Sequence, residues 1–287
     1  MPDAVIVADR TGRIVYVNRK AEALTGYRRP ELIDRKVEVL VPARLRTIHA
    51  RHRKGFYARG VARPMGSPDA DFSLRRKDAT VIPVEISLGP AGDDTVATVR
   101  DVTERRRMEH ALEHRALHDP LTDLANRTLF FDRLHQSMYT ARREHSHVAL
   151  VTLDVDGFKA INDAYGHAAG DAVLRELAAR LQRDLRSTDT AARIGGDEFA
   201  LILPGFANRR ILERMVRKRL AAAQETLVVR RKKIELRVSA GIALYPDHGS
   251  DADALMRHSD GAMYSAKREG RTVVFHLPGP RGRLRAR

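Results

Sequence analysis

The sequence predicts an α+β protein built from two domains that a charged helix connects. Short apolar runs alternate with turn signals over the first hundred or so residues, which is typical of a small antiparallel sheet. From residue 119 onward, buried-strand runs alternate with longer helical patterns, which indicates a central sheet with packed helices. We therefore divide the 287 residues into a first domain (1–104), a linker helix (105–117), a second domain (118–278) and a disordered basic tail (279–287).

The amino-acid composition excludes several kinds of site and indicates where the protein works. The chain has no cysteine, which excludes disulfides, thiolate zinc sites and a cysteine nucleophile, and which fits a reducing cytoplasm. The longest apolar stretch, near 148–155, is too short to cross a bilayer, and the N-terminus lacks the features of a secretory signal. We expect a cytoplasmic protein without a membrane span.

The net charge of +15 comes from 52 lysines and arginines against 37 acidic residues. Such a surface attracts polyanions such as nucleic acid, anionic lipid or nucleotides. The positive charge is spread along the chain, however, and no basic motif is interleaved with aromatic residues. We interpret the charge as a solvated surface and expect no nucleic-acid partner.

The first domain is predicted strand by strand. The turn Arg10-Thr11-Gly12 joins two strand-like runs in a hairpin, and a short helix follows. Three further strands complete an antiparallel sheet with small helices in its middle. The predicted strands cover 5–8, 14–17, 71–76, 80–87 and 95–99, and the helix covers 21–26.

Three segments of this domain carry a resemblance to a known family. They read ADRTGRIVYVNRKAEALTGY, RRKDATVIPVEISL and RDVTERRRME. In this order they resemble a PAS domain over residues 1–104, which implies a sensor. His49 and His52 lie about where some haem-binding PAS domains carry the axial ligand, but many PAS domains without haem also have a histidine there. We favour a dimerisation module or a small-molecule sensor over a haem protein.

The stretch from Val102 to Leu117 has no glycine or proline and is rich in charge. A narrow apolar stripe runs along it when it is drawn as a helix. The stripe consists of Met108, Ala111, Leu112, Ala116 and Leu117. The stripe is only about two heptads long, so it fits two structures almost equally well. One is a two-helix coiled coil in a dimer, and the other is a single connecting helix packed on its own domain.

The second domain begins with the buried-strand run HVALVTLDV at 147–155. A helical face follows over 170–185, and two strands then flank Gly195-Gly196. This order suits a central sheet with helices packed on one side. The remaining predicted elements are strands at 191–194, 199–203, 233–244 and 272–276, a helix at 211–224, and one or two helices within 251–268.

Two carboxylates follow a glycine pair in the turn Gly195-Gly196-Asp197-Glu198. Paired glycines permit positive φ and let the backbone approach a ligand closely. Adjacent acids at the tip of a turn repel each other, and a bound cation would relieve that repulsion. The alternative is an ordinary hairpin turn with solvated acids.

Another acid, Asp154, lies at the end of the buried strand, where it is placed to face a cleft. Carboxylates from two segments, without histidine or cysteine, suit Mg²⁺ and its phosphate-bearing substrates. Further along, Asn162 and Asp171 together match the hydrogen-bonding edge of guanine. The alternative for these two residues is that they cap the helix expected to begin near Gly170.

Lys267 and Arg271 are four residues apart near the end of the chain. If the helix continues through them, they share a face and could hold a triphosphate. The alternative is a solvated helix end.

Five segments occur in order along the second domain. They read HDPLTDLANR, DVDGFKAINDAYGHAAGD, RIGGDEF, SAGIALYP and SDGAMYSAKREGR. Together they closely resemble the GGDEF family of diguanylate cyclases over residues 117–277. The resemblance implies a mostly antiparallel central sheet flanked by helices, as in nucleotidyl cyclases and palm domains. It also implies condensation of two GTP into cyclic di-GMP and two pyrophosphates, Mg²⁺ or Mn²⁺ as cofactor, and a homodimer.

The resemblance further implies roles for single residues. The metal ligands are Asp154, the Val155 carbonyl, Asp197 and Glu198, and the catalytic residues are Asp197, Glu198 and Lys159. The substrate-binding residues are Asn162, His167 and Asp171 around guanine and ribose, the Gly157 and Phe158 amides with Lys267 and Arg271 on the phosphates, and Gly195 and Gly196 beside the α-phosphate.

The resemblance also extends to regulation. Arg186-Ser187-Thr188-Asp189 fits the RxxD site at which this family binds its product, cyclic di-GMP, as an inhibitor, and its offset from Gly195 is that of the family. The alternative is a helix-end Arg–Asp pair of little energetic value. For the whole domain, the rival to an enzyme is a catalytically silent receptor for GTP or cyclic di-GMP. Such domains usually lose acids of the signature, and all of them are present here.

Overall fold

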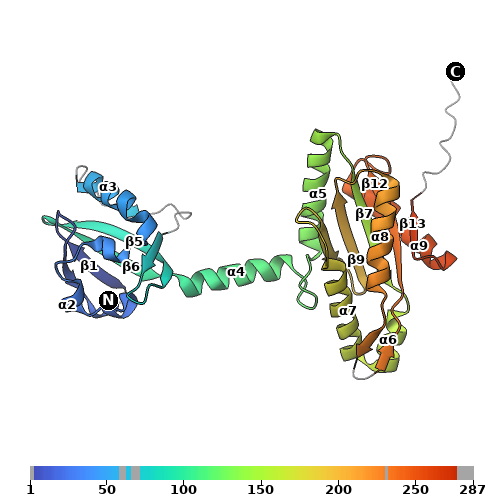
Figure 1. The fold of residues 1–287 in the computed structure, drawn as a ribbon, viewed down its shortest axis with the longest axis horizontal. Helices are drawn as coiled ribbons and strands as arrows, with labels where there is room; N and C mark the ends of the chain where they lie inside the picture. The colour runs from blue at the N-terminus through green and yellow to red at the C-terminus, as the bar shows by residue number, and fades with distance from the viewer. Residues whose placement is uncertain (1–2, 58–62, 66–71, 230–231, 277–287) are drawn as a thin grey trace, which may run out of the picture. The chain divides into compact units, whose positions relative to one another are not determined.

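The computed structural model describes residues 3–57, 63–65, 72–229 and 232–276. The chain contains two compact units, Met1–Leu112 and Glu113–Arg287, each with its own hydrophobic core (Figure 1). The tail predicted at 279–287 lies outside the described residues. Within the described ranges, no helix is both long enough and apolar enough to cross a membrane.

The first unit is an antiparallel sheet with short helices. Its strands lie in the order β2-β1-β6-β5-β3, and β4 also pairs with β5. The predicted antiparallel sheet with small helices is confirmed, and α3 and β3 are additional elements. The bounds are β1 (Ala4–Ala8), β2 (Ile14–Val17), α1 (Arg19–Thr25), α2 (Arg29–Leu32), the 3₁₀ helices η1 (Val37–Leu40) and η2 (Ala43–Leu45), α3 (Arg46–Tyr57), β3 (Arg63–Met65), β4 (Phe72–Arg75), β5 (Val81–Ala91) and β6 (Asp94–Asp101).

α3 carries both histidines on which a haem site would depend. His49 Nδ1 lies 3.2 Å from Glu38 Oε1, and Arg53 Nε donates to the same oxygen at 3.0 Å. Burial works to raise the pKa of Glu38, but the bonds from Arg53 and His49 outweigh it and lower that pKa. His49 is thus engaged through one ring nitrogen and His52 is exposed. The expected role of this domain, a dimerisation module or a small-molecule sensor, stays a prediction.

The linker is the helix α4 (Thr103–Leu117). Met108 and Leu112 of its apolar stripe are 61% and 66% exposed. These two side chains are therefore not packed on their own domain, which removes that alternative for them. The coiled coil with a second copy stays a prediction.

The second unit is a five-stranded sheet in the order β13-β12-β7-β9-β8. β13 runs parallel to β12, and all other neighbours are antiparallel, so the mostly antiparallel sheet is confirmed. The bounds are α5 (Arg127–Glu144), β7 (Val148–Val155), α6 (Phe158–Tyr165), α7 (His167–Gln182), β8 (Thr190–Arg193), β9 (Glu198–Pro204), α8 (Arg209–Ala223), β10 (Leu227–Val229), β11 (Lys232–Ile234), β12 (Val238–Tyr245), α9 (Ala252–Glu269) and β13 (Val273–Phe275).

The strand predicted at 233–244 is wrong as a single element. β11 pairs with β10 in a separate two-stranded sheet, and β12 begins only at Val238. β11 pairs with β10 and β12 pairs with β7. The residues between β11 and β12 therefore connect two different sheets and belong to neither strand.

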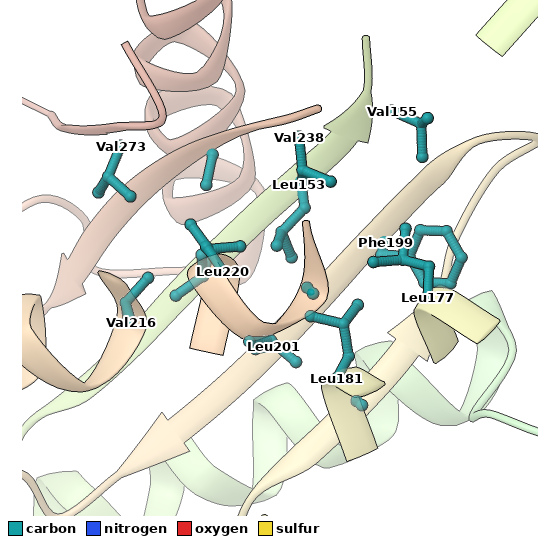
Figure 2. Packing of buried hydrophobic residues seen from close by; sticks show 14 of the residues in the cluster. Leu153, Val155, Leu177, Leu181, Phe199, Leu201, Val216, Leu220, Val238 and Val273 are labelled. Carbon is teal, nitrogen blue, oxygen red and sulfur yellow. The ribbon is translucent and has the colours of Figure 1, made fainter. Parts of the chain in front are cut away.

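Helices cover both faces of the central sheet, so the prediction of helices on one side is wrong. The residues of β7 alternate between two cores: Val151 and Leu153 face α7 and α8, whereas Leu150 faces α5 and α9. Figure 2 shows the first core, where Leu153 lies among the other strand and helix side chains, including Leu177 of α7 and Leu220 of α8. A strand covered on both faces needs a nearly continuous apolar run, as VALVTL at 148–153 provides.

α9 approaches β12 closely. A Cβ at Gly241 would lie 2.0 Å from the Ser259 carbonyl oxygen and 2.2 Å from the Met263 nitrogen, both in the backbone of α9. Only glycine leaves room for this approach. The contact sets how deeply α9 sits on the sheet and so places the side chains that α9 brings to the strand ends.

Three histidines near the ends of β12 and β13 predict a pH-dependent stability. The rings of His258 and His276 stack at 4.1 Å, and His248 meets His276 edge-on at 5.2 Å. Burial lowers the pKa of His248 and of His276, and neighbouring histidines add to the effect. Because the unfolded chain then binds more protons, we expect the free energy of unfolding to fall as the pH drops below about 6.5. Thermal melts across this range should show a smaller loss for His276→Gln, and an unchanged loss would contradict the assignment.

Candidate functional site

The acids of two predicted motifs meet at the ends of β7 and β9. Asp154 pairs directly with Glu198 on one neighbouring strand and with Ser239 on the other. Directly opposed residues of a sheet point to the same face, so both carboxylates face one space on the side of α5 and α9. The Val155 amide donates to the Asp197 carbonyl at 3.4 Å, which brings the third acid next to them.

Charge repulsion is built into this cluster. Burial raises the pKa of Asp154, Lys267 opposes that rise, and Asp197 adds to it. Burial also raises the pKa of Glu198, with further contributions first from Asp260 and then from Asp154 and Asp197. A cation between these carboxylates would offset their repulsion.

The donor set fits a hard divalent cation. It consists of carboxylate oxygens without histidine or cysteine, which is the chemistry that Mg²⁺ and Mn²⁺ prefer. Within the described ranges, no three acidic or imidazole side chains form a ready-made metal cage. Instead, Lys267 Nζ lies 2.5 Å from Asp154 Oδ1, so this carboxylate already attracts a cation from the chain itself. Asp154, Asp197 and Glu198 are the residues that would hold a metal ion.

The two glycines of the turn have different surroundings. A Cβ at Gly195 would lie 2.5 Å from Glu198 Oε2, so the Glu198 carboxylate occupies the space that a side chain would need. A Cβ at Gly196 would meet nothing within 4 Å. Gly195 therefore makes room for the acid, and only Gly196 leaves open space for a substrate.

An ion pair fixes the shape of the turn. Arg193 Nη1 bonds both carboxylate oxygens of Asp119 at 3.0 and 3.1 Å, and both residues are mostly buried. The same guanidinium donates from Nε and Nη2 to the Gly196 carbonyl at 3.1 and 2.7 Å. Asp119 was not identified from the sequence, although it lies within the quoted segment HDPLTDLANR. Together these bonds tie the glycine turn to the segment that enters the domain.

The residues predicted to read guanine lie where α6 meets α7. A Cβ at Gly170 would lie 2.0 Å from Asn162 Oδ1, so the Asn162 amide rests on Gly170, next to Asp171. α7 begins at His167 with Gly166 as its N-cap, which makes no side-chain capping bond. The capping alternative for Asn162 and Asp171 is therefore wrong.

Gly170→Ala tests this arrangement. The added methyl group should displace the Asn162 amide, because the methyl group and the amide oxygen cannot share the same space. For GTP, the substrate that the resemblance implies, we expect KM to rise roughly tenfold, the cost of about one lost hydrogen bond, with kcat changed less. Steady-state kinetics would measure this, with Ala168→Gly on the exposed side of α7 as the control. An unchanged KM would contradict the role of Asn162.

The loop after β7 is held by a residue that sequence reasoning missed. The Asp156 carboxylate accepts from Ser239 Oγ at 2.9 and 3.0 Å, and its amide donates to the Arg237 carbonyl at 2.9 Å. Gly157 then caps α6 with a φ of +68°, which favours glycine. The amides of Gly157 and Phe158 therefore lie at the start of α6. The second acid of the DVDGF segment was the available signal for Asp156.

Lys267 and Arg271 do not lie on one continuous helix. α9 ends at Glu269, and Gly270 takes the left-handed conformation that ends helices. Lys267 reaches Asp154, whereas Arg271 lies beyond the helix and pairs with Glu269 at 3.3 Å. The condition for a shared helical face is therefore not met. Lys159 on α6 and His167 at the start of α7 are exposed.

The RxxD segment adopts a compact turn. The Arg186 amide donates to Asp189 Oδ2 at 3.1 Å, and the Arg186 side chain is exposed. The Asp189 side chain is only 3% exposed and faces Arg219 of α8 at 3.8 Å. The predicted alternative, a helix-end pair between Arg186 and Asp189, does not appear among the ion pairs of the described residues. Arg219 comes from a distant helix, and no local pattern indicated it.

Comparison with family models gives two matches in the order of the two units. Residues 116–273 match the model described as diguanylate cyclase, GGDEF domain, and residues 2–104 match a PAS domain. The GGDEF match covers Asp154, Asp197 and Glu198 of the acidic cluster and Lys267 of α9. The PAS match covers the six-stranded sheet.

Relatives of known name support the same assignment. The chain is 33% identical to a probable diguanylate cyclase, DgcE of Escherichia coli, over 95% of this chain and 25% of DgcE. It is 32% identical to the cyclic di-GMP phosphodiesterase PdeR of Escherichia coli, over 93% of this chain and 40% of PdeR. It thus spans less than half of the length of either relative.

A solved structure extends the likeness to the fold. The coiled coil and GGDEF domain of DgcB from Caulobacter crescentus, in complex with c-di-GMP, matches with a TM-score of 0.56 and 31% identity. The match covers 61% of this chain and 93% of the DgcB chain. Given the ordered motifs, the sheet topology, the cluster of acids and these matches, the chain belongs to the GGDEF family of diguanylate cyclases and carries a PAS domain ahead of its GGDEF domain.

Proposed function

We propose that this chain is an active diguanylate cyclase, which condenses two GTP into cyclic di-GMP and two pyrophosphates. The observation that carries the proposal is the convergence of Asp154, Asp197 and Glu198 at two adjacent strand ends. The contact of the Asn162 amide with Gly170, the residue before Asp171, supports guanine as the base that is bound. Relatives named as diguanylate cyclases, and the DgcB structure that contains c-di-GMP, support the same reaction.

Some of the site residues would hold the metal ion, and others would bind the phosphates of GTP. A bound Mg²⁺ or Mn²⁺ would neutralise phosphate charge and lower the pKa of the attacking 3′-hydroxyl. Asp154, the Val155 carbonyl, Asp197 and Glu198 would hold that ion. The Gly157 and Phe158 amides would bind the β- and γ-phosphates at the start of α6.

Two lysines would offset the negative charge of the phosphates. Lys267, which here pairs with Asp154, would turn to the phosphates when a metal ion takes its place on the carboxylate. Lys159 would stabilise the charge of the transition state, and Arg271 would join Lys267 at the triphosphate. Gly196 leaves the space that the α-phosphate needs.

The reaction requires two copies of the chain. The 3′-oxygen of one GTP forms a bond to the α-phosphorus of the GTP on the partner copy, and the bond from that phosphorus to pyrophosphate breaks. The hydroxyl proton leaves to solvent, and a second attack of the same kind closes the ring. Each domain holds one GTP, so the active form is a homodimer. The PAS domain and α4 would set how often the copies meet.

One assay tests the proposal. The purified chain, incubated with GTP and Mg²⁺, should release cyclic di-GMP and pyrophosphate, which chromatography separates. Binding of GTP or cyclic di-GMP without product would favour the silent receptor, an alternative supported by the likeness to PdeR, which is named for another activity. Neither product nor binding would overturn both functions.

Arg186→Ala tests product inhibition. The exposed Arg186 guanidinium would bond a phosphate of cyclic di-GMP, and its loss should cost a charge-assisted hydrogen bond. We expect the half-inhibitory concentration of cyclic di-GMP to rise roughly tenfold or more, with the uninhibited rate unchanged. Ser187→Ala serves as the matched control. Unchanged inhibition in the Arg186 variant would remove the RxxD assignment.

A further inference from the structure

The connection from α7 to β8 runs over residues 183–189, and the RxxD segment is its second half. The connection leaves the helical path at Asp184, which has a φ of +62°. Within the segment, the Asp189 amide donates to the Arg186 carbonyl at 3.0 Å, and the Arg186 amide donates to Asp189 Oδ2 at 3.1 Å. These two bonds close the turn on itself but do not attach it to the rest of the domain.

Arg219 of α8 makes that attachment at both ends of the connection. Its Nη1 donates to the Arg183 carbonyl at 3.0 Å, and its Nη2 donates to the Asp184 carbonyl at 2.8 Å. The same Nη2 lies 3.8 Å from Asp189 Oδ2, the oxygen that closes the turn. Both side chains of this ion pair are mostly buried. Because a guanidinium presents its donors in a rigid planar fork, one side chain fixes the start and the end of the connection relative to α8.

The Arg186 side chain projects from this turn without support of its own. It is exposed, and its guanidinium has no hydrogen-bond or ion-pair partner among the described residues. The backbone of the turn therefore decides where the guanidinium can reach. Two side chains anchor that backbone to the domain: Leu185, which packs against the hydrophobic core, and Arg219, which makes the polar contacts.

We propose that Arg219 is a positioning residue of the product site, which holds the RxxD turn in the shape that presents Arg186 to cyclic di-GMP. A ligand binds more tightly when the groups that contact it are already held in place, because less conformational freedom is lost on binding. Without Arg219, two backbone carbonyls and the Asp189 carboxylate lose a donor, and the turn can take other shapes. This inference rests on the proposed function, because it assumes that cyclic di-GMP binds at the RxxD segment.

Isothermal titration calorimetry of cyclic di-GMP into the full chain tests the proposal. Excess 3′-deoxy-GTP and Mg²⁺ would occupy the nucleotide site, and the missing 3′-hydroxyl prevents turnover during the titration. We expect Arg219→Gln to raise the Kd of cyclic di-GMP about three- to tenfold. Arg219→Lys keeps the charge but loses the fork, so its Kd should lie between those of the wild type and Arg219→Gln.

Arg180 of α7 provides a matched control. Its side chain is only 10% exposed, and its Nη1 donates to the Ala223 carbonyl at 3.1 Å and to the Glu225 carbonyl. It is thus another mostly buried arginine that bonds two backbone carbonyls, but neither carbonyl belongs to the connection that carries the RxxD segment. Arg180→Gln should lower Tm about as much as Arg219→Gln and leave the Kd within about twofold of wild type. An equal loss of affinity in both variants would show that Arg219 supports the fold alone, and the proposal would be overturned.

A double variant distinguishes positioning from an independent effect. If Arg219 acts by placing Arg186, its loss costs little once the Arg186 side chain is gone. The variant Arg186→Ala/Arg219→Gln should therefore bind cyclic di-GMP about as weakly as Arg186→Ala alone, and losses that multiply would overturn the proposal. If Arg219→Gln does not fold, as judged by circular dichroism, Arg219→Lys replaces it in every comparison, with Arg180→Lys as its control.

The outcomes separate this inference from the proposed function. If Arg186→Ala weakens binding and Arg219→Gln does not, the positioning role is overturned and the RxxD assignment stands. If Arg186→Ala leaves the Kd unchanged, or if the wild-type chain binds no cyclic di-GMP, the RxxD assignment and this inference are both overturned. Turnover is decided separately, by the assay with GTP and Mg²⁺.

Discussion

Asp197→Asn should abolish GTP conversion while leaving the fold intact. The substitution keeps the size of the side chain and removes the charge that would hold a cation at the glycine turn. We expect cyclic di-GMP formation to fall by roughly 10²–10³-fold, the usual loss when one preorganised electrostatic group is removed from a reacting centre. Chromatography of the products at saturating GTP and Mg²⁺ measures the rate.

The stability of the Asp197 variant should not fall. Asp197 raises the pKa of Asp154 and of Glu198, so its charge repels two neighbours in the folded protein. Without it, the variant should melt at or above the wild-type temperature. Asp132→Asn, on the exposed side of α5, is the control and should change neither the rate nor Tm. Wild-type-like product formation by the Asp197 variant would refute the role assigned to this residue.

Gly241→Ala should destabilise the GGDEF domain strongly. The new Cβ would lie 2.0 and 2.2 Å from backbone atoms of α9, which cannot turn aside as a side chain could. We expect a loss of about 1–3 kcal/mol or more, as for other overpacked cores. For a domain of this size that corresponds to a fall in Tm of roughly 2–4 °C for each kcal/mol. Because α9 also brings Lys267 to Asp154, activity should fall even below Tm.

The same substitution on α9, the helix that packs against Gly241 of β12, provides the control. Gly261 is exposed within α9, and a Cβ there would meet nothing within 4 Å. Gly261→Ala should therefore raise stability by about 0.5–1 kcal/mol through helix propensity alone. Thermal melts of the two variants should move in opposite directions. A Gly241 variant as stable as wild type would show that α9 can lift from the sheet without cost.

Much of the fold and the core of the site could be predicted because their signals are local. The apolar run of β7, interrupted only by Thr152 and Asp154, predicts a buried strand. Acids from two segments, Asp154 in β7 and Asp197-Glu198 at the start of β9, predict that a cation binds between them. Burial on both faces was not predicted, although the same run indicates it. The division between β11 and β12 depends on which strand each one pairs with, and the sequence between them carries no turn signal strong enough to show it.

The supporting residues of the site could not be predicted from a local pattern. Asp260, Arg219 and Asp119 act through partners that are distant in the sequence, on other helices or strands. Asp260 is an exposed acid on α9 and Arg219 is a mostly buried arginine on α8. No local spacing in the sequence marks either of them as a site residue. Only the packing of α9 on β12, and of α8 beside α7, brings them to the site.

The packing of Glu198 onto Gly195 makes the signature a single steric unit, because its first glycine and its last acid compete for one volume. A sequence that gains a side chain at the first position must shorten or displace the acid three residues later. A small side chain at the first position should therefore move the end of the Glu198 side chain while every charged letter of the signature survives.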